Sequence, residues 1–263
     1  MTLTPGRIRN GDVELSYLAS NGTGSPVVIL HGLAGSSREF VPTAEALTEH
    51  RVIVVDARGH GRSTRRPVDV SREAHVSDVV RVIEAVAGEP VALVGQSMGG
   101  HTAMLTAAAR PELIERLVLL EVGSGGDGTA ESRRELAAFF ESWPVPFSND
   151  RAAADFLGNT PLAHAWAADL ERRDDGLMPR FDADIMMTTL AHVDARPRWT
   201  EWESVSAPTL ALFADNGMFA PSVKDEFVAR GRNVSRVDIA SASHDAHLDA
   251  FAPWIRHLHG FLE

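Results

Sequence analysis

Residues 91–103 read VALVGQSMGGHTA, and this stretch decides the fold. An apolar run of strand length ends at Gly95, and a helix-forming run begins at Ala103. Between them, the pattern Gly95-x-Ser97-x-Gly99 is typical of a nucleophile elbow, a sharp turn that joins a strand to a helix. Because such a turn strains the serine backbone, the residues around it must be small. We therefore expect Ser97 to lie at the top of a sheet, at the N-terminus of a helix.

The composition sets limits on the function. The chain has 263 residues, which suits one large α/β domain with an inserted part. Its net charge of −11 argues against nucleic acid as a partner. It has no cysteine, which excludes disulfides and thiol nucleophiles and fits the cytoplasmic location that we expect. We also expect no signal peptide and no membrane span, because no apolar run has the required length or setting.

Apolar runs of strand length recur along the chain and alternate with helical patterns. A hairpin is predicted over residues 8–19, because Asn10-Gly11 is a signal of tight turns. Alternation of strands and helices implies a parallel sheet with right-handed crossovers. The apolar runs that we interpret as buried strands are residues 27–30, 52–55, 91–94, 117–120, 208–213 and 234–239.

The alternation stops after Glu121. Residues 124–205 carry helical patterns and no clear strand, with apolar residues at the i, i+3, i+4 spacing of a helix face. We therefore predict two parts: a core made of residues 1–123 and 206–263, and a helical cap of residues 124–205 that covers the elbow.

With the elbow in place, three further features give the chain a family resemblance. They are the loop at His31-Gly32, the segment DARGHGRS at residues 56–63, and a late histidine, His244. Together with the elbow they resemble the α/β-hydrolase fold family over about residues 8–263. The resemblance implies an α/β fold with a mostly parallel central sheet, flanking helices and an inserted helical cap.

The resemblance also implies catalytic roles. Ser97 would be the nucleophile, which needs a base to remove its proton. His244 is our candidate for the base because it follows the last strand, and His247 is its competitor. The oxyanion hole would use the backbone N–H groups of Met98, after the nucleophile, and of Leu33, in the loop after an early strand.

The acid of the triad has two candidates. At the position where the family usually carries aspartate, this chain has Gly217, and Asp215 lies two residues earlier. Glu121 directly follows the apolar run 117–120, where a carboxylate is costly unless it is paired. Such a glutamate resembles the acid of haloalkane dehalogenases and zearalenone-type lactonases, of which only the lactonases share the serine nucleophile. We favour Glu121, with Asp215 as the alternative.

The sequence thus indicates a cofactor-free serine hydrolase without a metal site. It would cleave an ester or lactone of a hydrophobic small molecule through an acyl-enzyme. Thioesters or carbon–carbon bonds are alternative substrates for the same triad. Nothing in the sequence indicates an oligomeric state. The cap residues that we predict to contact the substrate are Trp143, Trp166 and Met186.

Other classes of protein fit less well. Gly32 and Gly35 after a strand, with Asp56 ending the next strand, loosely resemble a dinucleotide-binding fingerprint, but the first Gly-x-Gly is missing. No glycine loop is followed by Gly-Lys-Ser/Thr, which excludes a P-loop. A hydrolase fold that serves as a ligand receptor remains the alternative that is not an enzyme.

Overall fold

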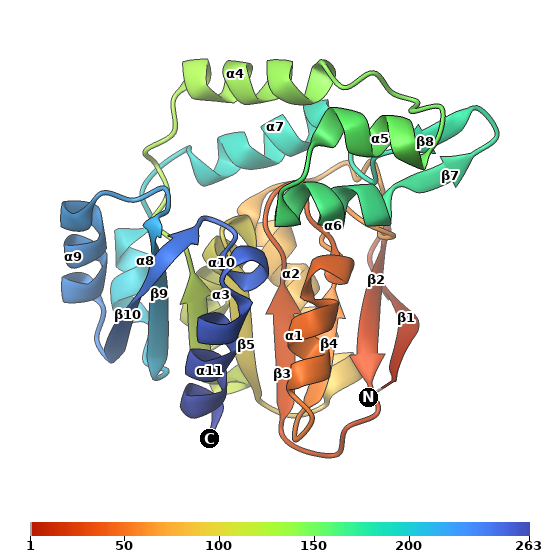
Figure 1. Ribbon diagram of the computed structural model, residues 1–263. Helices are drawn as coiled ribbons and strands as arrows, with labels where there is room; N and C mark the ends of the chain where they lie inside the picture. The colour runs from red at the N-terminus through yellow and green to blue at the C-terminus, as the bar shows by residue number, and fades with distance from the viewer. Residues whose placement is uncertain (1) are drawn as a thin grey trace.

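An eight-stranded sheet forms the centre of the computed structural model, which describes residues 2–263 (Figure 1). The strand order is β1-β2-β4-β3-β5-β6-β9-β10. Strand β2 is antiparallel to both neighbours, and the other pairs are parallel, as the alternating pattern predicts. The strands are β1 (Leu3–Asn10), β2 (Val13–Ser20), β3 (Pro26–Leu30), β4 (Arg51–Val55), β5 (Val91–Gln96), β6 (Ile114–Leu120), β9 (Thr209–Asn216) and β10 (Val234–Ser243).

Helices cover both faces of this sheet (Figure 1). Local sequence signals set where they begin: α2, for example, starts after Ser71, whose side chain accepts a hydrogen bond from the Ala74 N–H. No helix among the described residues is long and apolar enough to cross a membrane. The core helices are η1 (Ser37–Phe40), α1 (Val41–Ala46), α2 (Arg72–Val82), η2 (Ile83–Ala87), α3 (Met98–Ala109), η3 (Pro111–Leu113), α9 (Pro221–Arg230), α10 (Ala246–Asp249) and α11 (Phe251–Leu262).

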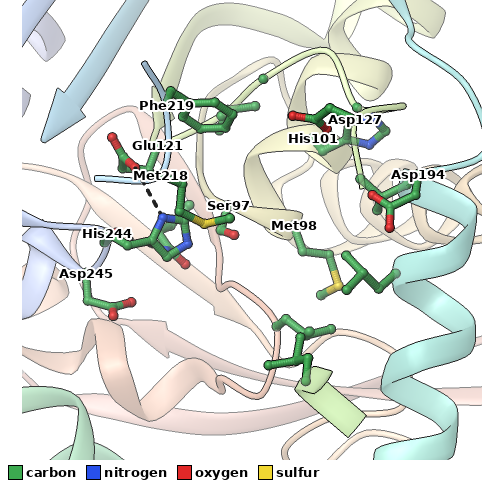
Figure 2. A pocket seen from close by; sticks show the side chains of 18 of the residues that line it. Ser97, Met98, His101, Glu121, Asp127, Asp194, Met218, Phe219, His244 and Asp245 are labelled. Carbon is green, nitrogen blue, oxygen red and sulfur yellow. Dashed lines mark hydrogen bonds and ion pairs between the residues drawn. The ribbon is translucent and has the colours of Figure 1, made fainter. Parts of the chain in front are cut away.

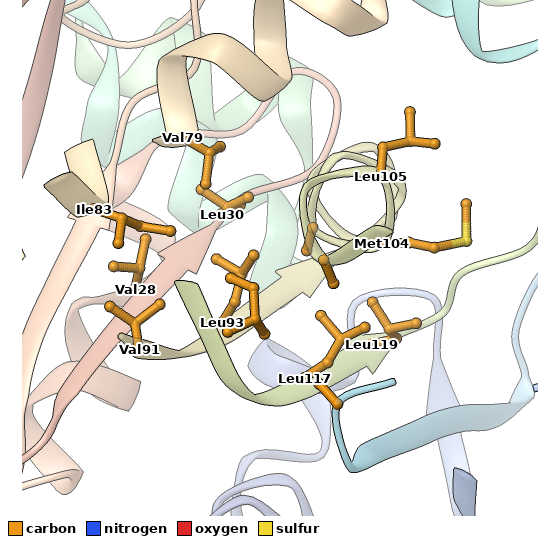
Figure 3. Close-up of a cluster of buried hydrophobic side chains, with 14 of the residues drawn as sticks. Val28, Leu30, Val79, Ile83, Val91, Leu93, Met104, Leu105, Leu117 and Leu119 are labelled. Atoms are coloured by element: carbon orange, nitrogen blue, oxygen red, sulfur yellow. The ribbon is translucent and has the colours of Figure 1, made fainter. Parts of the chain in front are cut away.

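Helices on both faces of the sheet explain why the strands are continuous apolar runs. Leu93 of β5 packs with α2 and α3 on one face (Figure 3). Its neighbour Val94 packs with α1 and α11 on the other face. Leu119 and Leu120 of β6 likewise pack on opposite faces of the sheet. Because successive strand residues point to opposite faces, both must be apolar when both faces are covered.

The inserted segment lies above the carboxyl ends of the parallel strands (Figure 1). One part of the expectation is wrong: residues 124–205 contain a short hairpin, whose three-residue strands are too brief to show a pattern. The last helix of the segment, α8, packs against α3, and its Trp202 lies in the core. The elements are α4 (Ala130–Glu141), α5 (Asp150–Leu157), α6 (Pro161–Asp169), β7 (Glu171–Arg173), β8 (Gly176–Met178), α7 (Ala183–Val193) and α8 (Trp199–Ser204).

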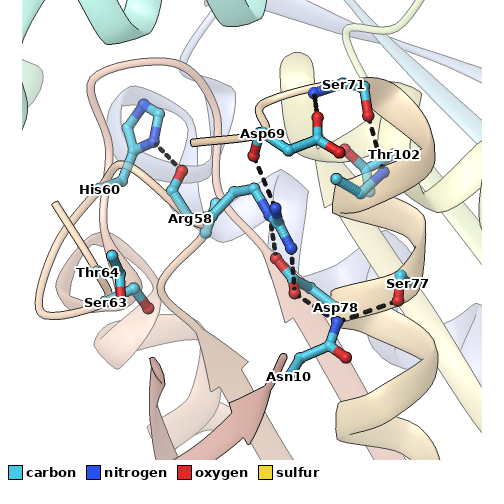
Figure 4. A network of polar contacts seen from close by, with 12 residues as sticks. Asn10, Arg58, His60, Ser63, Thr64, Asp69, Ser71, Ser77, Asp78 and Thr102 are labelled. Carbon is cyan, nitrogen blue, oxygen red and sulfur yellow. Dashed lines mark hydrogen bonds and ion pairs between the residues drawn. The ribbon is translucent and has the colours of Figure 1, made fainter. Parts of the chain in front are cut away.

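A buried ion pair fixes the loop that follows β4 (Figure 4). Arg58 in this loop donates from Nε and Nη2 to the two carboxylate oxygens of Asp78 on α2, at 2.6 and 2.7 Å. Asn10 at the end of β1 donates to the same carboxylate at 2.8 Å. The edge hairpin, the loop and α2 are therefore held by one carboxylate.

We predict that Asp78→Asn destabilises the fold by roughly 3–5 kcal/mol, because it leaves the Arg58 guanidinium buried without its counter-charge. Urea unfolding followed by circular dichroism measures the change. Glu112→Gln is the control, since Glu112 pairs with Arg110 at the surface and such a pair contributes about 0–1 kcal/mol. Equal effects of the two substitutions would contradict the role assigned to Asp78.

Candidate active site

Ser97 sits between the end of β5 and the start of α3, in the turn that the sequence predicts. Its φ of 52° and ψ of −120° place a non-glycine residue in a rarely populated backbone conformation. Such strain costs about 1–3 kcal/mol and persists only where the surroundings enforce it. Strained residues cluster at functional sites, so the observed conformation supports a functional reading of Ser97.

The glycines around Ser97 are required by close backbone contacts. A Cβ atom at Gly95 would lie 2.5 Å from Cα of Gly100, and one at Gly99 would lie 2.5 Å from the carbonyl oxygen of Leu30. Both separations are shorter than side chains tolerate. The elbow therefore fits against β3 and its own helix only because these positions carry no side chain.

His244 and Glu121 come together, although 123 positions separate them in the sequence. His244 follows β10, and Glu121 follows β6 with a fully buried side chain. Nδ1 of His244 lies 3.3 Å from Oε2 of Glu121 (Figure 2). The same carboxylate accepts two backbone N–H bonds of 2.8 Å, from Ala214 and from Met218.

These hydrogen bonds keep the Glu121 carboxylate ionised. Burial by itself raises the pKa of Glu121, but the bonds from His244, Ala214 and Met218 outweigh it and hold the pKa below its ordinary value. An ionised carboxylate accepts the proton on Nδ1 of His244. Nε2 of the imidazole is then left with a free lone pair, which a general base needs.

Gly217 provides the space for this carboxylate. A Cβ atom at position 217 would lie 2.5 Å from Cδ of Glu121 and would overlap both carboxylate oxygens. An aspartate at this position and a carboxylate of Glu121 in its present place therefore exclude each other. Asp215, the other candidate, is exposed at the end of β9 and makes no contact with His244 among the hydrogen bonds and ion pairs of residues 2–263.

His247 is buried one turn beyond His244, on α10. Its ring stacks on Phe40 with centroids 4.3 Å apart. Burial lowers the pKa of His247 to about 4, and neither ring nitrogen has a hydrogen-bond partner among the described residues. His247 does not line the cavity that His244 lines, so its position fits packing rather than proton transfer.

Ser97, His244 and Glu121 line one cavity of about 370 Å³ between the sheet and the inserted helices (Figure 2). Leu33 and Met98, whose N–H groups are the candidates for the oxyanion hole, line it too. The cavity is mostly apolar, which suits a small molecule with few polar groups. Its apolar lining from the inserted segment consists of Leu136, Phe139, Phe140, Leu162, Trp166, Leu190 and Val193.

The structure separates the three cap residues predicted to contact a substrate. Trp166 lines the cavity and donates its ring N–H to the carbonyl of Ala34 at 3.1 Å. Trp143 and Met186 do not line it: both are buried inside the inserted segment, where Trp143 packs on Trp166 with ring centroids 5.3 Å apart. The helical spacing marks an apolar face without showing which of its members faces the cavity.

His101 and Glu39 are among the lining residues that the sequence analysis does not predict. His101 lies four residues after Ser97, which places both on one side of α3, so its spacing was an available signal. Glu39 on η1 is buried and also lines the cavity. No sequence signal marks it, because a glutamate in a helical run is normally solvated.

The family model described as "alpha/beta hydrolase fold" matches residues 25–251. The chain belongs to the α/β-hydrolase fold family. It is 33% identical over 253 residues to the mouse sn-1-specific diacylglycerol lipase ABHD11, a match that spans 90% of this chain and 81% of the relative. It is 24% identical to the esterase YbfF of Escherichia coli, over 86% of this chain and 88% of that protein.

Solved structures agree on the fold. E-2-(acetamidomethylene)succinate hydrolase superposes with a TM-score of 0.89 at 19% identity, covering 99% of each chain. A thioesterase domain from the curacin biosynthetic pathway superposes with a TM-score of 0.80 at 21% identity, covering 98% of this chain and 99% of that domain. At these identities the likeness concerns the fold alone.

Glu39 generates a prediction about pH and stability. Burial raises the pKa of Glu39 from 4.5 to about 8, and the carboxylates of Asp245, Asp169 and Asp56 add to the shift, while His31 opposes it. The folded state thus holds a proton that the unfolded state releases above about pH 4.5. Stability is lost as the pH rises from there towards 8.

We expect Glu39→Gln to remove this loss. Between pH 5 and pH 8, the free energy of unfolding of the variant should rise by roughly 3–5 kcal/mol relative to that of the wild type. Urea unfolding at both pH values measures it. Glu45→Gln, at an exposed position of α1, is the control and should follow the wild type. If Glu39→Gln showed the pH dependence of the wild type, the carboxyl would not be protonated in the folded state.

Proposed function

We propose that this protein is a serine hydrolase that cleaves an ester or lactone of a hydrophobic small molecule through an acyl-enzyme. One observation carries the proposal. A serine in a strained elbow and a histidine bonded to a buried carboxylate line the same apolar cavity. A serine hydroxyl becomes a nucleophile only beside a base, and the base works only in the right tautomer.

In the proposed reaction, Nε2 of His244 takes the proton of Ser97 Oγ as the oxygen attacks the carbonyl carbon. The oxyanion that forms accepts hydrogen bonds from the backbone N–H groups of Met98 and Leu33, and each such donor contributes about 3–4 kcal/mol. The intermediate collapses to the acyl-enzyme, and His244 protonates the departing alkoxide. Water, activated by the same imidazole, then releases the acid and restores Ser97.

Glu121 completes the proposed triad in place of Asp215. Its carboxylate stabilises the positive charge that His244 carries during each proton transfer. Backbone bonds from Ala214 and Met218 hold the carboxylate in place, so it needs no reorganisation when that charge forms. We also propose that residues 124–205 act as the cap of the site, since their apolar side chains supply much of the cavity lining.

The same triad could also catalyse other hydrolytic reactions. Hydrolysis of thioesters or of carbon–carbon bonds would use the same three residues. Relatives of this chain carry the names lipase, esterase and putative carbamate hydrolase, the last 28% identical over 90% of this chain, in Azorhizobium caulinodans. Such names favour an ester-type bond to a carbonyl carbon. A ligand receptor would bind in the cavity without turnover.

The nucleophile provides the direct test. We predict that Ser97→Ala lowers kcat for a p-nitrophenyl ester on the order of 10⁶-fold and leaves the fold intact. A fluorophosphonate should label the wild type at Ser97 and leave the variant unlabelled, as peptide mass spectrometry will show. Ser124, which lies in the chain between the lining residues Gly123 and Gly125, carries the same hydroxyl and is the control: Ser124→Ala should still be labelled. Full turnover by Ser97→Ala would end the proposal, and labelling without turnover of any ester, thioester or lactone would favour the receptor.

A further inference from the structure

The charged side chains that line the cavity are all acidic. No lysine or arginine of residues 2–263 is among the lining residues, whereas five carboxyl groups are. His101 lines the cavity as well, but burial and the nearby charges of Arg72 and Arg198 lower its pKa to about 3, so it is neutral at neutral pH. The five carboxyl groups belong to Glu39, Glu121, Asp127, Asp194 and Asp245.

Three of these groups are neutralised or occupied. Glu39 keeps its proton at neutral pH. Glu121 is bonded to His244. Asp194 is paired with Arg133 at 2.7 Å, and this arginine itself does not line the cavity.

The remaining two carboxyl groups of the lining are those of Asp127 and Asp245. Neither forms an ion pair with a residue of the described chain. Figure 2 shows Asp127 and Asp245, which directly follows His244 in the sequence, on opposite sides of Ser97. A substrate bound at Ser97 therefore meets a carboxylate towards either side of the cavity, with no cation to offset it.

We infer that the cavity selects esters that are uncharged or cationic and discriminates against esters that carry a carboxylate or phosphate. The inference rests on the proposed function and names the substrate class of the same site. A negative group of the substrate loses its hydration in a mostly apolar cavity and finds only like charges there. An ammonium group finds carboxylates and aromatic side chains such as those of Trp166 and Phe139, with which a cation can interact favourably.

The test uses three p-nitrophenyl esters with acyl chains of equal length that end in methyl, carboxylate or trimethylammonium. Each kcat/KM is divided by the rate of hydroxide-catalysed hydrolysis of that ester, which removes differences in intrinsic reactivity. We expect the carboxylate ester to be about 100-fold worse than the methyl ester, and the ammonium ester to be equal or better. The difference should shrink in about 0.5 M salt.

Variants locate the effect. Asp127→Asn combined with Asp245→Asn should raise the ratio of carboxylate ester to methyl ester by about 10-fold. Asp174→Asn is the matched control, because Asp174 is exposed in the β7–β8 turn outside the cavity lining, and the same loss of charge there should leave the ratio unchanged. An equal shift in the control would attribute the effect to the net charge of the protein and overturn the inference.

The outcomes separate the two proposals. Turnover of the methyl ester with no discrimination by charge, or with a preference for carboxylate, overturns the inference and keeps the hydrolase. If no ester is turned over, the charge preference can still be measured by how much octylammonium or octanoate slows the labelling of Ser97 by a fluorophosphonate. Stronger protection by octylammonium supports the inference, and equal or weaker protection overturns it.

Discussion

The carboxylate of Glu121 joins the ends of three neighbouring strands. It follows β6, accepts N–H bonds from Ala214 in β9 and from Met218 just beyond that strand, and contacts His244 after β10. A buried carboxylate with fewer donors would be costly to keep ionised. The carboxylate can reach these donors only because position 217 is a glycine, since a side chain there would overlap it.

The rest of the site is built on a rigid sheet covered on both faces. β5 runs at its centre, between β3 and β6, and delivers Ser97 into a turn that only glycine neighbours allow. The inserted segment closes the space above this turn with apolar side chains, and the core supplies the serine, the histidine and the glutamate. The core thus fixes where the serine, the histidine and the glutamate lie, whereas the shape and polarity of the cavity depend largely on the inserted segment.

The elbow and the parallel sheet could be predicted from the sequence because each leaves a local mark. The pairing of Glu121 with His244 could be predicted because the chain resembles the α/β-hydrolase family. Continuous apolar runs indicate strands that are covered on both faces of the sheet. Gly217 stands at the position where the family usually carries aspartate, which directs attention to Glu121. The cavity lining left no such mark. Trp143 and Trp166 both belong to apolar stripes, yet only Trp166 faces the cavity. Glu39 and His101 are buried polar residues, whose burial depends on contacts between distant segments.

The most direct measurement is kcat for Glu121→Gln beside that for Asp215→Asn. Glutamine keeps the shape of Glu121 but offers the imidazole the wrong hydrogen-bonding partner and no charge. We predict a loss on the order of 10⁴-fold for Glu121→Gln and a change of only about 2-fold or less for Asp215→Asn. A nearly silent Glu121→Gln together with an inactive Asp215→Asn would contradict it and assign the acid to Asp215.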